Sequence, residues 1–268
     1  HYQQYFRAIK LGGILMATKK ETKTGKTIAS VRKAVEVIEY IAHSKTELGV
    51  TEISKGLGYG VSATYHLLNT LKQSNIIEQD KISKKFKLGL KLWQIGMLAY
   101  DQNHISISLK PYLKELKNLT GETANLTIMD NHQIVYIAQE ESDNLVRMFT
   151  KTGAAAPLHC TAAGKVLLAF KPKKVQESIM DKIELTKYTD NTITTRDELI
   201  EEMKIIKERG YGFDREERET GVSCIGAPVF NLRGEAIACI TISGPTTRFT
   251  EINKEKWIKD VLQVSGEA

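Results

Sequence analysis

The sequence predicts an α+β fold in two parts, a small helical head followed by a mixed β-sheet with helices packed on it. In the first third of the chain, apolar residues recur with the spacing of amphipathic helices. Beyond Gly121, short strand-like segments mostly follow one another and helical segments are grouped between them, which is typical of a mixed sheet covered by helices. At 268 residues, the chain is long enough for two domains with modest cores.

Composition narrows the class of protein. The chain has 41% hydrophobic and 26% charged residues, as ordinary globular proteins do, and no apolar run approaches the roughly 18 residues of a membrane span. Its three cysteines, Cys160, Cys224 and Cys239, are too few and too odd in number for a disulfide framework, so we expect a reducing, cytoplasmic location. Because neither a phosphate-binding loop nor a dinucleotide-binding glycine pattern is present, we expect no cofactor.

We expect residues 1–26 to lie outside the fold, as a disordered or mis-assigned N-terminal extension. Residues 1–15 contain no convincing capped helix, and the Lys- and Thr-rich residues 17–26 are typical of a flexible terminus. Residues 11–16 could be a translated ribosome-binding site, because two glycine codons can spell its G-rich core just upstream of a start codon. A cleaved signal peptide fits less well, since the apolar stretch is shorter than the usual hydrophobic region.

The net charge of +6 is unevenly distributed. Residues 17–92 carry 14 Lys and Arg against 7 Asp and Glu, whereas residues 93–268 carry 22 against 25. A basic head on a mildly acidic body is typical of a modular nucleic-acid-binding protein. Lysine-rich segments are more often plain solvated surface, so the charge favours a DNA-binding head without deciding it.

Residues 27–89 have the pattern of a winged helix-turn-helix domain. Ser30 can cap a helix whose apolar residues follow helical spacing, and Gly58-Tyr59-Gly60 supplies the turn between a short helix and a longer one. Two short strands then bracket a lysine-rich loop and predict a wing. The predicted elements are helices over residues 30–42, 51–57 and 62–73 and strands over residues 76–79 and 86–88. A short helix, a glycine turn and a longer helix form the layout with which many proteins read DNA.

The helix over residues 62–73 has an apolar face and a polar face. Thr64, Leu67, Leu68 and Leu71 lie on the apolar face, and the opposite face carries side chains that can bond to base edges in the major groove. Lysines of this helix and of the wing suit phosphates. The predicted DNA contacts are Ser62, Ala63, Tyr65, His66, Asn69, Lys72, Gln73, Lys81, Lys84 and Lys85. A helical domain that contacts only protein is the alternative.

Residues 90–102 are predicted to form a linker helix. Leu92, Ile95 and Leu98, with Trp93 beside them, make it more apolar than a lone exposed linker should be. A second subunit is the natural partner for such a face, so we expect a homo-oligomer. The next helical segment, residues 105–119, contains Pro111 near its middle, which predicts one broken helix or two short ones.

The second part, residues 103–268, alternates strand and helix patterns. Residues 123–129 and 133–138 flank the turn Asp130-Asn131-His132 and predict a hairpin, and residues 145–150 read as a third strand. The remaining predictions are helices over residues 160–170, 172–183, 197–209 and 253–264 and strands over residues 211–214, 222–230 and 236–243.

Residues 204–231 carry the most specific pattern in the chain. A helix that ends at a glycine is followed by two acidic residues at fixed offsets and by a strand of small residues, with eight constrained positions: Gly210, Asp214, Glu217, Cys224, Gly226, Val229, Phe230 and Asn231. This pattern resembles the signature of the IclR family of bacterial transcription regulators. Residues 62–71 also look like the family's recognition helix, and residues 88–96 like the start of its linker. The resemblance covers the chain from Thr27 to its C-terminus, with His66 standing where the family commonly has Arg.

The resemblance implies a GAF-like, effector-binding second domain in a ligand-responsive transcription regulator, a repressor rather than an activator. Its partners would be double-stranded DNA with a near-palindromic operator, a small-molecule effector, and a second or further copies in a homodimer or tetramer. Carried over residue by residue, the effector-binding positions are Leu145, Met148, Ala162, Ala163, Asp214, Val222, Cys224, Thr241 and Ser243.

These positions predict a small carboxylate, of the hydroxy-acid or sugar-acid type. A helix that begins near residues 162–164 would expose N–H groups to an anion. Simple packing would explain Ala162, Val222 and Cys224 equally well. Asp214 and the hydroxyls of Thr241 and Ser243 are harder to explain as packing, because buried polar groups need partners.

Enzyme and metal functions are the remaining alternatives. Cys160 or Cys224 with His159 could supply a nucleophile and a base, but sequence neighbours seldom reach the required geometry. The same residues with Asp214 could converge on zinc, yet they lack any paired short-range spacing. We therefore predict no catalytic residue and no metal site. The competing function is a metabolite-binding or hydrolytic protein whose head only mediates oligomerisation.

Overall fold

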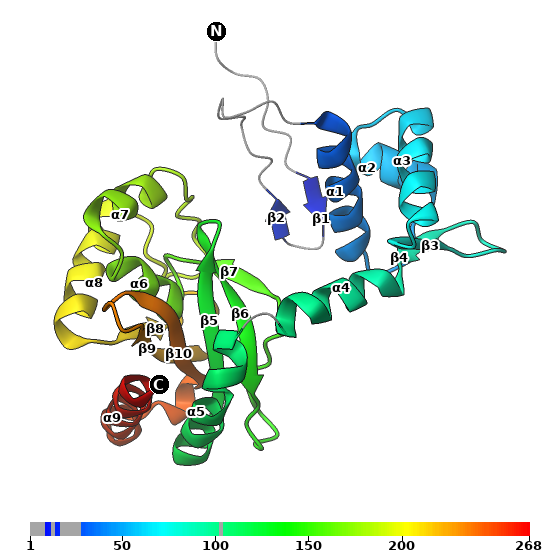
Figure 1. Cartoon of the computed structure of the whole chain (residues 1–268). Coiled ribbons are helices and arrows are strands. Elements are labelled where there is room, and N and C mark those ends of the chain that lie inside the picture. The colour runs from blue at the N-terminus through cyan, green and yellow to red at the C-terminus, as the bar shows by residue number, and fades with distance from the viewer. Residues whose placement is uncertain (1–8, 12–13, 17–27, 102–103) are drawn as a thin grey trace, which may run out of the picture. The chain divides into compact units, whose positions relative to one another are not determined.

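The computed structural model describes residues 9–11, 14–16, 28–101 and 104–268 (Figure 1). They fall into two compact units, divided between residues 102 and 103. Near the N-terminus, β1 (Ile9–Leu11) pairs antiparallel with β2 (Ile14–Met16), a pairing that the sequence analysis does not predict. The rest of the expected N-terminal extension, residues 1–26, lies outside the described residues.

The first unit confirms the winged helix-turn-helix. Its elements are α1 (Ala29–Ala42), α2 (Val50–Leu57), α3 (Val61–Gln73), β3 (Ile77–Gln79) and β4 (Phe86–Leu88). The turn between α2 and α3 depends on Gly58, whose φ of 69° is a left-handed conformation that glycine adopts without strain. Ser54 closes the turn, since its carbonyl accepts from the Tyr59 N–H at 3.0 Å and its hydroxyl donates to the Tyr59 carbonyl at 2.7 Å. The core beneath contains Val37, Ile41, Ile53, Leu68, Leu71, Ile77 and Phe86.

The predicted linker is a helix, α4 (Leu90–Asp101). Leu90, Trp93, Ile95 and Leu98 are exposed on it. Gly89 immediately before it allows a close approach, because a Cβ there would lie 2.3 Å from the Asn75 carbonyl oxygen. The chain can therefore turn from the wing into α4 only with glycine at this position.

The second unit is built on a six-stranded sheet in the order β7-β6-β5-β10-β9-β8. The strands are β5 (Thr123–Asp130), β6 (Gln133–Glu140), β7 (Ala155–Pro157), β8 (Gly212–Arg215), β9 (Val222–Phe230) and β10 (Ala236–Pro245). All pairings of this sheet that the structure describes are antiparallel, so the prediction of a mixed sheet is wrong. The physical reason is that two three-stranded meanders join through β5 and β10, and the helical connection between β7 and β8 links opposite edges rather than neighbouring parallel strands.

The third strand also differs from its prediction. Residues 145–150 form no strand, and Leu145, Val146 and Phe149 are exposed. The strand that pairs with the start of β6 is instead β7, with Gln133 opposite Pro157. Apolar residues predicted a strand here, but without a neighbouring strand they gain neither a hydrogen-bond ladder nor burial.

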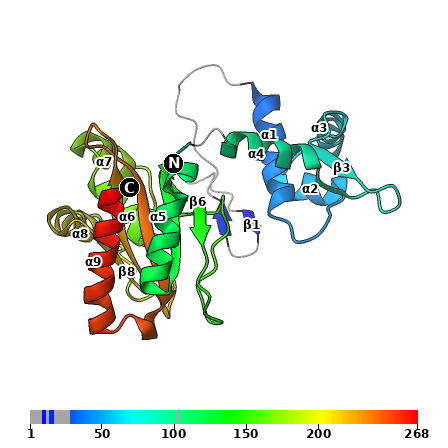
Figure 2. The ribbon, with the colours of Figure 1, turned by 60° about the horizontal axis from the view of Figure 1, so that its bottom comes forward.

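Helices cover both faces of the sheet. One face packs against α5 (His104–Thr120) and α9 (Glu251–Glu267), which lie side by side in Figure 2. The other packs against α6 (Ala162–Ala169), α7 (Lys173–Met180) and α8 (Arg196–Arg209). A short 3-10 turn, η1 (Thr246–Arg248), precedes α9. None of the helices in the described part of the chain is both long and apolar enough to span a membrane.

Pro111 does not break α5, contrary to the prediction. A proline inside a helix costs about 3 kcal/mol, because it removes one hydrogen bond and crowds the preceding turn. Leu109, Leu113 and Leu116 from the same helix are buried in the core against the sheet. Burial of three leucines contributes roughly 1.5–3 kcal/mol each, which outweighs the local cost.

Candidate effector cavity and DNA-facing helix

The strand register brings three predicted effector residues into one row. Asp214 on β8 lies opposite Cys224 on β9, and Cys224 lies opposite Ser243 on β10. Because side chains alternate between the two faces of a strand, Thr241 shares the face of Ser243. This face is the one covered by α6. Residues far apart in the sequence therefore meet between the sheet and the start of α6.

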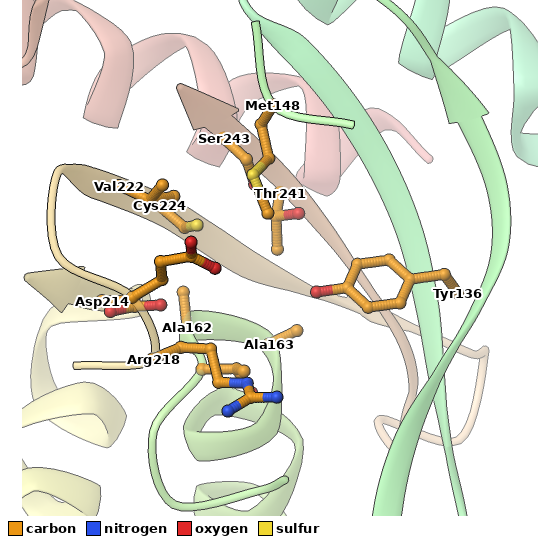
Figure 3. A pocket seen from close by; sticks show the side chains of 12 residues that line it. Tyr136, Met148, Ala162, Ala163, Asp214, Arg218, Val222, Cys224, Thr241 and Ser243 are labelled. Carbon is orange, nitrogen blue, oxygen red and sulfur yellow. The ribbon is translucent and has the colours of Figure 1, made fainter. Parts of the chain in front are cut away.

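A cavity lies at this meeting point (Figure 3). The space that its walls enclose, together with the open solvent at its mouth, is about 430 Å³. Of the nine predicted effector residues, eight line it: Met148, Ala162, Ala163, Asp214, Val222, Cys224, Thr241 and Ser243. Leu145 does not, since its side chain is 97% exposed. Four lining residues were not predicted: Tyr136, Thr161, Arg218 and Glu219.

The start of α6 presents backbone N–H groups to the cavity. Thr161 caps the helix, as its hydroxyl oxygen accepts from the Gly164 N–H at 3.1 Å and its hydroxyl donates to the Pro157 carbonyl at 2.8 Å. The Gly164 N–H is thereby used in the cap. The N–H groups of Ala162 and Ala163, in the first turn, have no acceptor within the helix and remain available to an anion.

The hydroxyls of Thr241 and Ser243 are presented as donors. The Asn125 amide nitrogen donates to the Ser243 oxygen at 3.2 Å and, more weakly, to the Thr241 oxygen at 3.5 Å. The Asn125 carbonyl oxygen in turn accepts from the Gln139 amide at 2.9 Å, which orients the Asn125 side chain. Since both hydroxyl oxygens already accept, their protons point elsewhere. The Ser243 hydroxyl is hydrogen-bonded to Cys224, and the Thr241 proton can point to a ligand. Sequence reasoning missed Asn125, although polar residues at alternate positions of its strand marked this face.

Asp214 has the electrostatics of a group that can change its protonation state. Its side chain is 2% exposed, and one oxygen accepts from the Glu217 N–H at 2.8 Å. Burial, followed by the charge of Glu217, raises the pKa of Asp214 from 3.8 to about 7, against opposing backbone hydrogen bonds. At neutral pH, Asp214 can therefore either accept a hydrogen bond or, when protonated, donate one.

A buried ionic cluster supports the wall of the cavity. Lys165, 1% exposed on α6, donates to a Glu217 carboxylate oxygen at 2.5 Å and to the Phe213 carbonyl at 2.6 Å. Its ammonium also lies 3.5 Å from Glu202, which pairs with Arg209 at 2.9 Å. The second Glu217 oxygen is buried without a hydrogen-bond partner in the described structure. These contacts tie α6, α8 and the segment after β8 together behind Asp214.

Tyr136 and the cysteines are neutral groups in this setting. Burial raises the pKa of the Tyr136 hydroxyl, which points from β6 into the space between the other labelled side chains in Figure 3. Burial likewise raises the pKa of Cys160 to about 12 and that of Cys224 even further. His159 is buried too, and its Nε2 must donate to the Thr186 carbonyl, 3.0 Å away, because a carbonyl can only accept. Burial lowers the pKa of this histidine.

These groups do not form the arrangement that a cysteine hydrolase needs. Such a hydrolase requires a thiolate beside a histidine whose free nitrogen acts as a base. The Cys160 and Cys224 thiols are protonated at neutral pH, and one nitrogen of His159 is already used by Thr186. Within the described ranges, no group of three or more His, Cys, Asp or Glu side chains is placed to hold a metal ion.

The predicted DNA-facing residues lie where an external partner could reach them. On α3, Ser62, Ala63, Tyr65, His66, Lys72 and Gln73 are exposed and Asn69 is half-buried; in the wing, Lys81 and Lys84 are exposed and Lys85 is half-buried. Gln79 joins helix and wing, because its side-chain oxygen accepts from Lys72 and its amide donates to the Lys84 carbonyl, both at 2.9 Å. Asp80 orders the wing turn by accepting from the Ser83 N–H at 2.7 Å.

Two family models match the chain and together cover both units. The IclR helix-turn-helix domain matches residues 30–81, and the bacterial transcriptional regulator IclR C-terminal domain matches residues 97–268. The chain belongs to the IclR family of bacterial transcription regulators. The resemblance seen in the sequence is thereby confirmed, and the chain is a ligand-responsive, DNA-binding regulator of this family.

Individual IclR-family proteins agree over most of the chain. The HTH-type transcriptional regulator KdgR of Escherichia coli (strain K12) is 34% identical over 91% of this chain and 92% of its own length. The HTH-type transcriptional repressor AllR of the same strain is 31% identical, over 83% and 82%. The crystal structure of the Thermotoga maritima IclR is 30% identical with a TM-score of 0.70, over 88% of this chain and 95% of that one. These relatives are named as regulators and not as enzymes.

Proposed function

We propose that this IclR-family regulator is a homo-oligomeric repressor whose operator affinity is set by a small hydroxylated carboxylate in the cavity. The observation that carries the proposal is the convergence of hydrogen-bond donors on one space. The N–H groups of Ala162 and Ala163 come from α6, and the hydroxyls of Thr241 and Ser243 come from β10. The two N–H groups lack an acceptor within the helix and lie at its positive end, which favours an anion.

Asp214 adds the requirement for a ligand hydroxyl. The carboxyl lines the same cavity and uses one oxygen for the Glu217 N–H. A fully ionised Asp214 would repel the ligand carboxylate, so it must face another part of the ligand or be protonated. A hydroxyl two or three bonds from the carboxylate satisfies Asp214 in both protonation states, because a hydroxyl both donates and accepts.

The ligand acts through a difference in affinity between two arrangements of the protein. A ligand that prefers the arrangement unable to bind the operator by tenfold weakens operator binding by about 1.4 kcal/mol. We place the operator contacts on the exposed face of α3, which would read bases, and on the wing lysines, which would contact phosphates. Two such heads in a homo-oligomer would read a near-palindromic operator.

Titration calorimetry of single-site variants tests the cavity. A thermal-shift screen of small carboxylates, sugar acids and aromatic acids first supplies a ligand. Ser243→Ala and Asp214→Asn should then weaken its binding and leave operator binding without ligand nearly intact. Ser223→Ala is the matched control, because Ser223 is a buried serine of β9 whose hydroxyl bonds to Thr246 and does not line the cavity. Equal ligand affinity in the wild type and in both cavity variants would place the effector elsewhere.

A further inference from the structure

Arg218 lines the cavity but has no role in the proposed carboxylate site. It follows β8 and lines the cavity together with Asp214 and Glu219. Its guanidinium carbon lies 4.0 Å from the centre of the Tyr188 ring, and Tyr188 stacks in turn on His159, with 6.1 Å between ring centres and 30° between planes. Arg218 is exposed, but its guanidinium is held against the Tyr188 ring.

The charge of Arg218 has no carboxylate partner in the described part of the chain. Glu219 lines the same opening, yet no salt bridge in the described residues joins the two. The guanidinium of Arg218 packs on the Tyr188 ring, and the backbone N–H of Arg218 donates to the Asp214 carboxylate. The guanidinium still acts on the interior of the cavity. Burial raises the pKa values of Tyr136 and Cys160, and Arg218 opposes the rise in both. An unpaired cation thus faces groups on the cavity walls.

The backbone before Arg218 is held by a second segment. The Thr189 hydroxyl donates to the Glu216 carbonyl at 2.6 Å, and the Thr192 hydroxyl donates to the Glu217 carbonyl at 2.6 Å. Beside them, the Asn191 amide donates to the carbonyl of Arg215 at 3.0 Å. This segment also supplies Tyr188. The same loop therefore fixes both the main chain that leads to Arg218 and the orientation of its side chain, so that little entropy remains to be lost on binding.

We propose that Arg218 forms a second anion-binding position at the opening of the cavity, preorganised by Tyr188, and that the effector of this chain carries a second acidic group. The inference rests on the proposed function, in which the first carboxylate binds at Ala162, Ala163, Thr241 and Ser243. A planar guanidinium can donate two parallel hydrogen bonds to a carboxylate or to a phosphate. The second group can thus be either, and the ligand class is a hydroxylated diacid or phosphorylated hydroxy acid.

Two matched pairs of probes test whether the cavity prefers a ligand with two acidic groups over a ligand with one. Malate differs from 3-hydroxybutyrate by one carboxylate in place of a methyl, and 3-phosphoglycerate differs from glycerate by the phosphate. Calorimetry on the full-length protein should show tighter binding of the two-acid member of at least one pair. In Arg218→Gln this preference should fall by about ten- to hundredfold, the loss expected for one charge-assisted contact, while the one-acid member keeps its affinity.

Neighbouring charges provide the controls. Arg215→Gln removes the same charge from an exposed arginine that packs on Phe213 and does not line the cavity, so it should leave the preference unchanged. Glu219→Gln removes an opening carboxylate and should not weaken the two-acid probe. Tyr188 acts through Arg218 as a positioning residue. Tyr188→Ala should reduce the preference, and Tyr188→Phe, which keeps the ring, should restore it.

The outcomes separate this inference from the proposed function. Suppose that Ser243→Ala weakens the binding of a two-acid probe, but Arg218→Gln and Arg215→Gln show the same preference for it. The second anion-binding position is then refuted, whereas the cavity is supported. Equal binding of both members of each pair to the wild type refutes it as well. If none of the four probes binds at millimolar concentration, the second position is refuted, and the cavity is judged separately by the effect of Ser243→Ala on the ligand that the thermal-shift screen supplies.

Discussion

Replacing Lys165 by Met tests whether a buried cation holds the wall of the cavity together. The side chains have similar length, so the change removes the charge and leaves most of the packing. The Glu217 carboxylate loses its 2.5 Å partner, while its second oxygen already lacks one in the described structure. The Phe213 carbonyl loses a hydrogen bond of 2.6 Å. Glu202 is less affected, because Arg209 remains as its partner.

The expected loss of stability is about 3–5 kcal/mol, the cost of breaking a buried ion pair by removing one partner. For a domain the size of the second unit, this lowers Tm by roughly 6–20 °C. Burial raises the pKa of Glu217, so this side chain can take up a proton once Lys165 is absent. The loss should therefore be smaller at pH 5 than at pH 8. The double variant Lys165→Met/Glu217→Gln should recover about 1 kcal/mol or more relative to Lys165→Met alone.

Urea unfolding followed by circular dichroism measures these differences. Arg196→Gln is the control, because it breaks an exposed ion pair with Asp181 and should cost no more than about 1 kcal/mol. If Lys165→Met costs no more than this control, or if the double variant is as unstable as Lys165→Met, the buried pair does not stabilise the fold as argued.

Three further predictions concern pH, DNA and assembly. Because the pKa of Asp214 is raised to about 7, its protonation stabilises the fold below about pH 4, and this contribution is lost as the pH rises through 7. Between pH 4 and pH 7, the free energy of unfolding of the wild type should thus fall by up to about 4 kcal/mol relative to that of Asp214→Asn, as measured by urea unfolding. If the difference between the two proteins does not change with pH, the pKa of Asp214 is not raised. Replacing Lys84 and Lys85 by Ala should weaken binding to all DNA sequences, as measured by gel retardation. The slope of log affinity against log salt concentration should become shallower by about one unit per lost phosphate contact. An unchanged slope would exclude the wing from the DNA interface. Leu92→Glu or Ile95→Glu would place a charge on the apolar helix α4 and should lower the mass of the oligomer measured by sedimentation. If both variants keep the mass of the wild type, α4 does not form the subunit interface.

Sequence by itself determined the family and most of the helices and strands. The helix-turn-helix followed from local periodicity, since Leu68 and Leu71 repeat on one face of α3 at helical spacing. The signature that ends at Asn231 identified the family because its spacing is a property of one continuous segment. Eight of the twelve cavity residues could be named in advance because the family resemblance carries them over position by position, whereas the ninth predicted residue, Leu145, depended on a strand that did not form.

Tertiary structure decided how these residues act on one another. The Asn125 amide reaches Ser243 across 118 residues of sequence, and Lys165 reaches Glu217 across 52. Arg218 owes its orientation to a tyrosine from a separate loop. Such contacts leave no periodic trace in the sequence, because they depend on strand register and on which loops fold over the sheet. The same long-range burial kept α5 continuous through Pro111, where local propensity alone predicted a break.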